Sequence, residues 1–329
     1  MGDIYMIKEC FNQEIQRLSN FYKQRKFDLT FMLAADSHLD DYEEDTILNM
    51  QVADSFVSYD FIVHLGDFMT GNMPKGYTAK VLKQEMSQYR SAVKNGVFYP
   101  VQGNHDGYCV SSFAGTSCDM VVDEDWYEVT NFTREYLNVT REENNPYYYA
   151  DYPEQKLRLV FLCSFSYEWT DEGKYRKKYR MSETQLQWLG SEALAVAAEW
   201  TVMIFSHDGP LKYFDQDRLH EESWEGNNKQ LLDVVLQARL ECGFAIAGWF
   251  IGHWHGELCE CVEGIPFIII GSQTYYVPSL WPMPDKGHYE LREVGTVSQD
   301  LWDSVSWNKA DRTLHLFRFG AGEDRVVTY

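Results

Sequence analysis

Five apolar runs of strand length each end in a cluster of polar residues, and this arrangement strongly limits how the chain can fold. The endings are Asp36-Ser37-His38, Gly66-Asp67, Gly103-Asn104-His105-Asp106, Ser206-His207-Asp208 and Gly252-His253-Trp254-His255. Unpaired polar groups are costly to bury. In open α/β sheets the carboxyl ends of the strands form the crevice where ligands bind. We therefore expect these side chains to gather at a single ligand site.

The apolar runs alternate with helical patterns, which predicts a layered α/β fold. The expected strands are 29–35, 61–65, 96–101, 157–163, 201–205 and 244–251. The expected helices are 43–57, 78–94, 182–198 and 228–240, and Ser182 has the chemistry of an N-cap for the third of them.

The last third of the chain has a different pattern, in which turns join strands at 258–262, 266–270, 304–307 and 313–319. We expect this C-terminal part, about 258–329, to be β-rich and mostly antiparallel. The segment of about 106–155 is aromatic and weakly periodic, so we interpret it as an insertion that overhangs the site. No linker rich in Pro, Gly or Ser divides the 329 residues, and we expect a single domain over 1–329.

The net charge of −21 argues against broad binding to nucleic acid or to anionic membranes. No run approaches the ~18 apolar residues of a membrane span, and residues 1–26 lack the apolar stretch of a signal peptide. The seven cysteines, an odd number, suit a reducing compartment. We expect a soluble cytoplasmic protein. Its oligomeric state remains open.

The strand endings contain the ligand atoms of a metal centre: two carboxylates, one amide oxygen and four imidazoles, with His105 in addition. Oxygen and imidazole ligands together suit Mn²⁺, Fe or Zn²⁺. Seven ligands exceed the needs of one tetrahedral ion, but they fit two ions that share a bridging carboxylate. Two ions ~3.5–4 Å apart activate a bridging water and hold a phosphoryl oxygen.

In order and chemistry, the five endings resemble the D-x-H, G-D, G-N-H-D, H and G-H-x-H blocks of the calcineurin-like metallophosphoesterases. This resemblance spans residues 36–255 and implies a four-layer αββα sandwich of two mixed β-sheets flanked by helices. It implies one metal ion on Asp36, His38, Asp67 and His255. It implies a second ion on Asp67, Asn104, His207 and His253, with Asp67 bridging the two.

The resemblance also implies a reaction, the hydrolysis of phosphoesters by a hydroxide that bridges the two metal ions. His105 would protonate the leaving oxygen or stabilise charge on the transferring group, and Asp106 would orient the His105 imidazole. We expect a small-molecule substrate, a phosphomonoester or phosphodiester of the nucleotide type.

Three alternatives remain beside this hypothesis. Protein serine/threonine phosphatases of the family typically carry G-D-x-V-D-R-G and G-N-H-E, whereas this chain has Phe68-Met69-Thr70-Gly71 and Asp106 at those places. A nuclease would need a basic surface, which the net charge of −21 disfavours. Some members of the superfamily are non-catalytic protein-binding scaffolds that have lost ligands, whereas this chain keeps all of them and His105.

Several further features allow both a structural and a functional interpretation. We expect His64 to be structural. The basic run 174–180 is interpreted as a solvated loop, with the docking of a second phosphate as the alternative. The segment 211–227, which contains Trp224, is a candidate specificity loop. Cys259 and Cys261 share a strand face, but without a companion pair nearby they do not indicate a zinc site.

Overall fold

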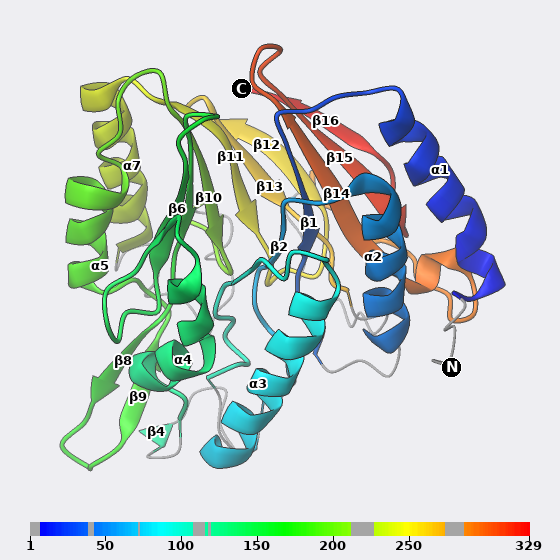
Figure 1. Cartoon of the computed structure of the whole chain (residues 1–329). Coiled ribbons are helices and arrows are strands. Elements are labelled where there is room, and N and C mark those ends of the chain that lie inside the picture. The colour runs from blue at the N-terminus through cyan, green and yellow to red at the C-terminus, as the bar shows by residue number, and fades with distance from the viewer. Residues whose placement is uncertain are drawn as a thin grey trace.

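A computed structural model of the chain describes residues 7–38, 43–71, 73–107, 116–117, 120–211, 227–273 and 286–329. Two large β-sheets pack face to face, and helices cover the outer face of each sheet (Figure 1). No helix in these ranges has the length and apolar character needed to cross a membrane.

The first sheet has six strands in the order β16-β15-β14-β1-β2-β3. Its strands are β1 (Leu29–Ala34), β2 (Phe61–His64), β3 (Phe98–Pro100), β14 (Leu301–Asn308), β15 (Thr313–Gly320) and β16 (Arg325–Thr328). β1, β2 and β3 are parallel, while β14 is antiparallel to β1, and β15 and β16 follow, each antiparallel to the strand before it. The sheet is therefore mixed, as predicted.

The second sheet has seven strands in the order β12-β13-β11-β10-β7-β6-β5. Its strands are β5 (Val139–Thr140), β6 (Tyr148–Tyr152), β7 (Leu157–Phe161), β10 (Thr201–Ser206), β11 (Ala245–Ile251), β12 (Leu258–Val262) and β13 (Ile265–Ile269). The central strands β7, β10, β11 and β13 are parallel, and the outer strands are antiparallel to their neighbours. A small third sheet has the order β4-β9-β8, from β4 (Thr116–Ser117), β8 (Ser166–Trp169) and β9 (Tyr175–Lys178).

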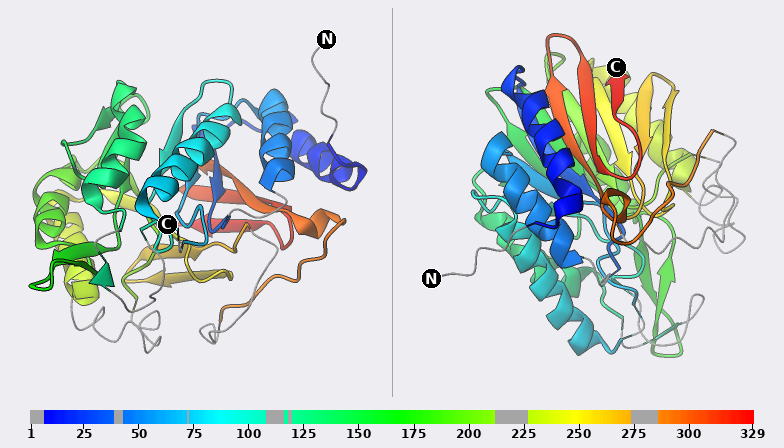
Figure 2. Two further views of the ribbon diagram at one scale, coloured as in Figure 1. Left: turned by 90° about the horizontal axis from the view of Figure 1, so that it is seen from below. Right: turned by 90° about the vertical axis from the view of Figure 1, so that its right-hand side faces the viewer.

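Helices flank the two large sheets on opposite sides (Figures 1 and 2). On the side of the first sheet lie α1 (Asn12–Lys23), α2 (Glu43–Val57), α3 (Lys75–Ser91) and α4 (Asp123–Thr130). On the side of the second sheet lie α5 (Glu183–Trp188), the π-helical turn η3 (Leu189–Ala193) and α7 (Lys229–Cys242). Short 3-10 turns occur at η1 (Glu9–Phe11), η2 (Asn131–Glu135) and η6 (Val297–Gln299).

The alternation of side chains along β1 shows how the layers hold together. Phe31 and Leu33 point into the core between the two sheets, whereas Met32 and Ala34 face the helices of the outer layer. The Phe31 ring lies 5.9 Å from the rings of both Phe205 and Phe250, which belong to the opposite sheet. Strand β1 is therefore buried on both faces. This explains why its sequence is continuously apolar.

Most of the predicted elements are present, but the helix expected over 182–198 is shorter. Ser182 caps it as predicted, since its hydroxyl accepts a hydrogen bond from the Gln185 amide at 3.2 Å. The α-helix ends at Trp188 and continues only as the π-helical turn. Gly190, a poor helix former, lies in that turn, and a Cβ at this position would lie 3.3 Å from Val234 of α7.

The segment of about 106–155 contributes to the main body of the fold. Within its described part, β5 and β6 pair alongside β7 and complete one edge of the second sheet, and α4 packs against the first-sheet helices. The β-rich C-terminal part divides between the sheets, because β12 and β13 join the second sheet and β14, β15 and β16 join the first.

Candidate metal centre

The strand-end turns that carry the candidate ligands have an unusual backbone conformation. Five of the seven lie in the left-handed region, with φ of 56° at Asp36, 52° at His38, 58° at Asp67, 67° at His253 and 55° at His255. Non-glycine residues rarely adopt this region, and strained positions of this kind cost of order 1–3 kcal/mol each. Such strain persists only where the surrounding structure enforces it.

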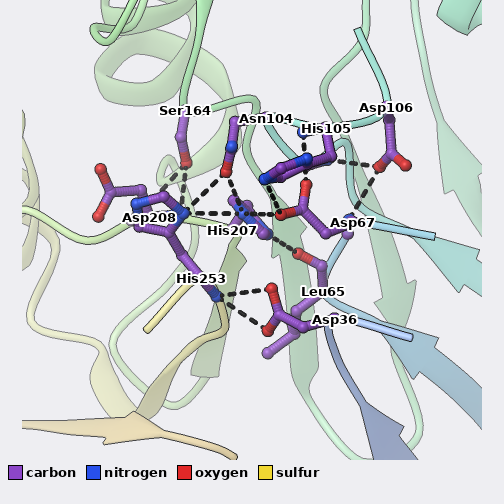
Figure 3. Close-up of polar contacts among 12 residues, drawn as sticks. Asp36, Leu65, Asp67, Asn104, His105, Asp106, Ser164, His207, Asp208 and His253 are labelled. Atoms are coloured by element: carbon purple, nitrogen blue, oxygen red, sulfur yellow. Dashed lines mark hydrogen bonds and ion pairs between the residues drawn. The ribbon is translucent and has the colours of Figure 1, made fainter. Parts of the chain in front are cut away.

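Backbone hydrogen bonds link the turns that follow β1 and β2. The amide of Asp36 donates to the Gly66 carbonyl at 2.9 Å, and the amide of His38 donates to the Asp67 carbonyl at 3.0 Å. Across the two sheets, the Asp36 carboxylate accepts the His253 amide at 3.0 Å (Figure 3). The two sheets are thus joined directly at the site.

Two glycines allow the turns after β2 and β3 to touch. A Cβ on Gly103 would lie 2.0 Å from the Asp67 amide nitrogen and 2.1 Å from Asp67 Oδ1. Gly66 has φ of +101°, and a Cβ there would lie 2.4 Å from the Gly103 nitrogen. Side chains at either position would separate the turns, which is the physical reason for a glycine in each motif.

The first group of candidate ligands consists of Asp36, His38, Asp67 and His255, whose ligating atoms all lie within 4.8 Å of one another. The Nε2 atoms of His38 and His255 are 3.1 Å apart, and His255 Nε2 is 3.5 Å from Asp36 Oδ1. Burial, together with the neighbouring His255 and His105, lowers the pKa of His38 to about 4 against the opposing effect of Asp67. The His38 ring is therefore neutral at pH 7, with a nitrogen lone pair free to bind a cation.

The second group consists of Asp67, His207 and His253, again within 4.8 Å, and Asn104 lies beside it. Asn104 Oδ1 is 2.9 Å from His207 Nε2 and 2.8 Å from His253 Nδ1 (Figure 3). His207 Nδ1 lies 2.8 Å from the Leu65 carbonyl, which fixes the proton of the neutral ring on that nitrogen.

The charge at His207 tests whether the second group suits a cation. Burial lowers the pKa of His207, but Asp67 and Asp36 raise it to about 9, so the metal-free ring carries a second proton on Nε2, which faces Asn104 Oδ1 and Asp67 Oδ2, the latter at 3.4 Å. This buried group of oxygens therefore favours a positive charge at Nε2, which a metal ion would supply in place of the proton. The donor set fits a metal ion of the type that binds oxygen and imidazole nitrogen together.

Asp67 belongs to both groups, as a shared ligand must. Its side chain is buried, which alone would raise its pKa, but His207 and His105 hold the pKa of Asp67 well below its usual range. The carboxylate therefore stays charged in the centre of the site.

His105 lies at the edge of the site, outside both groups. Its Nδ1 is 2.8 Å from the Thr70 carbonyl, its Nε2 is 3.9 Å from Asp67 Oδ2, and its ring lies 4.9 Å from that of His38. The ring is partly exposed, with 21% of its side chain accessible. This position suits a group that exchanges a proton with a bound molecule.

Asp106 requires a correction, because we expected it to orient the His105 imidazole. Its carboxylate instead accepts hydrogen bonds from three backbone amides, at 2.9 Å from Asp67, 2.8 Å from Phe68 and 2.8 Å from Gly103. The Thr70 carbonyl lies against the His105 ring in its place. A short aspartate directly after the turn reaches back to the backbone more readily than across to its neighbour's ring.

The basic run 174–180 also requires a correction, because it is not a solvated loop. It contains strand β9, and Lys177 donates from Nζ to the Asn104 carbonyl at 2.9 Å. Lys177 therefore contacts the site although it lies outside the five strand-end motifs. The alternation of Tyr175, Lys177 and Tyr179 with arginine or lysine is a strand pattern, and it could have indicated strand β9 but not the contact with Asn104.

The other residues singled out in the sequence lie outside the two ligand groups. His64 is buried and stacks on Phe68 at 3.9 Å between ring centroids, and its Nδ1 accepts the Gly66 amide at 3.2 Å, so its contacts are structural. Cys259 and Cys261 are both exposed free thiols. Most of the candidate specificity loop, with Trp224, lies outside the described residues.

Comparison with protein families supports the same chemistry. The family model "Calcineurin-like phosphoesterase" matches residues 29–257, and the chain belongs to this family. It is accordingly a metal-binding hydrolase of phosphoric esters. A search of curated proteins found no match.

Among solved structures, the chain is similar to a single mutant of Vps29 from Entamoeba histolytica at 10% identity and a TM-score of 0.36, over 92% of this chain and 99% of that one. It is also similar to a phosphopantetheinyl hydrolase from Mycobacterium tuberculosis, at 11% identity and a TM-score of 0.41, over 74% of this chain and 89% of that one. A putative 5'-nucleotidase from Staphylococcus aureus has 13% identity and a TM-score of 0.44, over 91% of this chain and 54% of that one. Similarities this weak carry no information about the substrate.

Proposed function

We propose that the chain hydrolyses small-molecule phosphomonoesters or phosphodiesters of the nucleotide type at a centre of two metal ions. The observation that supports this most is the geometry of Asp67, which lies within 4.8 Å of two separate sets of ligating atoms. One ion would be held by Asp36, His38, Asp67 and His255. The second would be held by Asp67, Asn104, His207 and His253.

Manganese, iron or zinc ions at these ligands would supply an activated bridging hydroxide and would neutralise charge on the phosphoryl oxygens. The chain itself supplies orientation. The Leu65 carbonyl fixes the tautomer of His207, and the Asp36 carboxylate holds the His253 amide. The ligand atoms thus face the centre before any substrate arrives.

His105 is proposed as the general acid. Hydrogen bonding of Nδ1 to the Thr70 carbonyl keeps a proton on that nitrogen, so a second proton taken up at Nε2 makes the imidazolium. Nε2 lies on the side of Asp67 and can pass this proton to the leaving oxygen of a bound ester. Asp106 acts indirectly, by holding the backbone of the turns beneath.

Three alternatives rank lower. The protein phosphatase branch is disfavoured by the missing Asp-Arg pair after Asp67, and a nuclease by the net charge of −21. A non-catalytic scaffold would not need to maintain five strained residues among a set of metal ligands.

The test is hydrolysis of p-nitrophenyl phosphate and bis-p-nitrophenyl phosphate by protein stripped of metal and reloaded with Mn²⁺, Fe²⁺ or Zn²⁺. We expect turnover only after reloading. Preference for the diester would direct the next panel to cyclic nucleotides, and preference for the monoester to nucleotides and sugar phosphates. A folded, metal-loaded protein that turns over neither compound would favour the scaffold.

A further inference from the structure

The hairpin formed by β8 and β9 contacts the turn that contains Asn104 and His105. Tyr167 of β8 and Lys177 of β9 are cross-strand neighbours, so their side chains emerge on the same face of the hairpin. Gln102 Nε2 donates to the Tyr167 hydroxyl at 3.3 Å, and a Cβ on Gly107 would lie 2.2 Å from that hydroxyl. The hairpin therefore packs against both ends of the turn.

Lys177 contacts the middle of the turn, at the peptide between Asn104 and His105. Its Nζ donates to the Asn104 carbonyl at 2.9 Å, while the His105 amide on the other side of the same peptide donates to Asp67 Oδ1 at 2.7 Å. Both polar groups of this peptide are thus held by side chains. The peptide joins a proposed metal ligand to the proposed acid, so its plane sets the direction of both.

Two aromatic rings hold the Lys177 amine in place. Nζ lies 5.1 Å from the Phe165 ring centroid and 4.7 Å from the Tyr179 ring centroid. The Phe165 ring in turn lies 5.9 Å from the ring of His207. The amine is therefore confined close to the site by residues outside the family motifs.

We propose that Lys177 is a positioning residue for the reaction, which fixes the Asn104–His105 peptide so that His105 meets the leaving oxygen. This inference rests on the proposed function. The proposal differs from the alternative in which the whole basic run docks a second phosphate. Strand alternation places Arg176 and Lys178 on the opposite face of β9 from Lys177, and Lys178 pairs there with Glu168 at 3.4 Å.

Kinetics of Lys177→Met, with Lys178→Met as the matched control on the same strand, test the proposal. Removal of the amine leaves the Asn104 carbonyl without this donor, which predicts a fall in kcat of about 10- to 100-fold with KM changed less than about threefold. Lys177→Arg, which keeps an N–H donor, should recover most of the loss, and Lys178→Met should match the wild type. A raised KM at unchanged kcat would overturn the proposal, since it would mean that Lys177 contacts substrate. Wild-type kinetics in Lys177→Met would also overturn it.

Amide hydrogen exchange of the full-length, metal-loaded protein provides a readout that does not need turnover. We expect peptides that cover residues 102–107 to exchange faster in Lys177→Met than in the wild type or Lys178→Met. Unchanged exchange there would contradict the positioning role. If the wild type hydrolyses no phosphoester, the proposed function fails on its own, while the exchange experiment still decides whether Lys177 holds the peptide.

Discussion

At the residue scale, most contacts of the site converge on Asp67. Its Oδ1 accepts the His105 amide, and its Oδ2 faces His207, His38 and the His105 ring at 3.4, 3.8 and 3.9 Å. Its own amide donates to Asp106. A substitution at this residue therefore affects metal binding, the proposed acid and the turn together.

We predict that Asp67→Asn loses bound metal as well as turnover, because an amide cannot serve as a charged ligand shared by two cations. His105→Ala should keep its metal and lose about 10²- to 10⁴-fold in kcat, the usual contribution of a general acid. Elemental analysis and kinetics separate the two effects. His288→Gln is the control, since this exposed histidine pairs only with Glu290 among the described side chains. Near wild-type turnover in both test variants would place the active site elsewhere.

Gly103→Ala should abolish metal binding even though it removes no ligand. The added methyl group would collide with the backbone and carboxylate of Asp67, so the two turns must separate. Gly76→Ala is the matched control, because nothing lies within 4 Å of a Cβ at this position in α3, and alanine is the better helix former there. Calorimetric titration with Mn²⁺ measures the difference. Equal affinities in the two variants would contradict the close approach of the turns.

At the element scale, a buried ion network ties the C-terminal strands to the loop after the second-sheet ligands. Arg318 of β15 bonds Asp303 of β14 at 2.9 Å and Glu257 at 2.7 Å, and Arg325 of β16 contacts the same two carboxylates. Glu257 also accepts the Gly271 amide at 2.7 Å. The network links β14, β15 and β16 to the segment directly after His255.

We predict that Asp303→Asn destabilises the fold by about 3–5 kcal/mol at pH 7, because it removes one of two buried carboxylates and leaves Arg318 and Arg325 to share the single charge of Glu257. Asp233→Asn, which breaks the exposed Lys229–Asp233 pair of α7, should cost less than about 0.5 kcal/mol. Urea denaturation measures both. A cost below about 1 kcal/mol for Asp303→Asn would show that the network contributes little.

The stability that Asp303 contributes has a predictable pH dependence. Burial opposes ionisation of Asp303, but Arg318 and Arg325 lower its pKa below the ordinary value. A carboxyl with a lowered folded pKa contributes stability above its unfolded pKa of about 3.9, and this contribution disappears as the pH falls through the folded pKa. The difference in unfolding free energy between wild type and Asp303→Asn should therefore shrink as the pH falls below about 4. A constant difference down to pH 2 would contradict this.

The elements of the fold differ in how far the sequence predicts them. The strands β1, β2, β3, β10 and β11 could be predicted from continuous apolar runs because they are buried on both faces, and each is followed by one of the five polar endings. The helix predicted over 182–198 is too long, because the α-helix ends at Trp188 and the π-helical turn that follows ends at Ala193. The Lys177 contact could not be predicted, since its partner is a carbonyl 73 positions away.

At the scale of the whole molecule, the candidate ligands come from both sheets. Asp36, Asp67 and Asn104 follow strands of the first sheet, and His207, His253 and His255 follow strands of the second. The order of the five motifs predicted this gathering of side chains. The shared position of Asp67 depends on how the two sheets pack together, and the sequence indicated it only through the resemblance to a family.

Because the ligands bridge the sheets, metal binding should stabilise the whole fold. Metal at about 100 times its dissociation constant adds about 2.7 kcal/mol per site to the unfolding free energy. We expect metal removal to lower the thermal midpoint measured by calorimetry and reloading to restore it. Asp67→Asn should show a much smaller shift, and an equal shift in the variant would mean that the stabilising metal binds elsewhere.

The central claim is that two metal ions share Asp67, and anomalous X-ray diffraction from crystals of the Mn²⁺-loaded protein tests it most directly. We predict two anomalous peaks, one on either side of the Asp67 carboxylate, with Asp36, His38 and His255 around one and Asn104, His207 and His253 around the other. A single peak, or peaks that do not contact Asp67, would contradict the account.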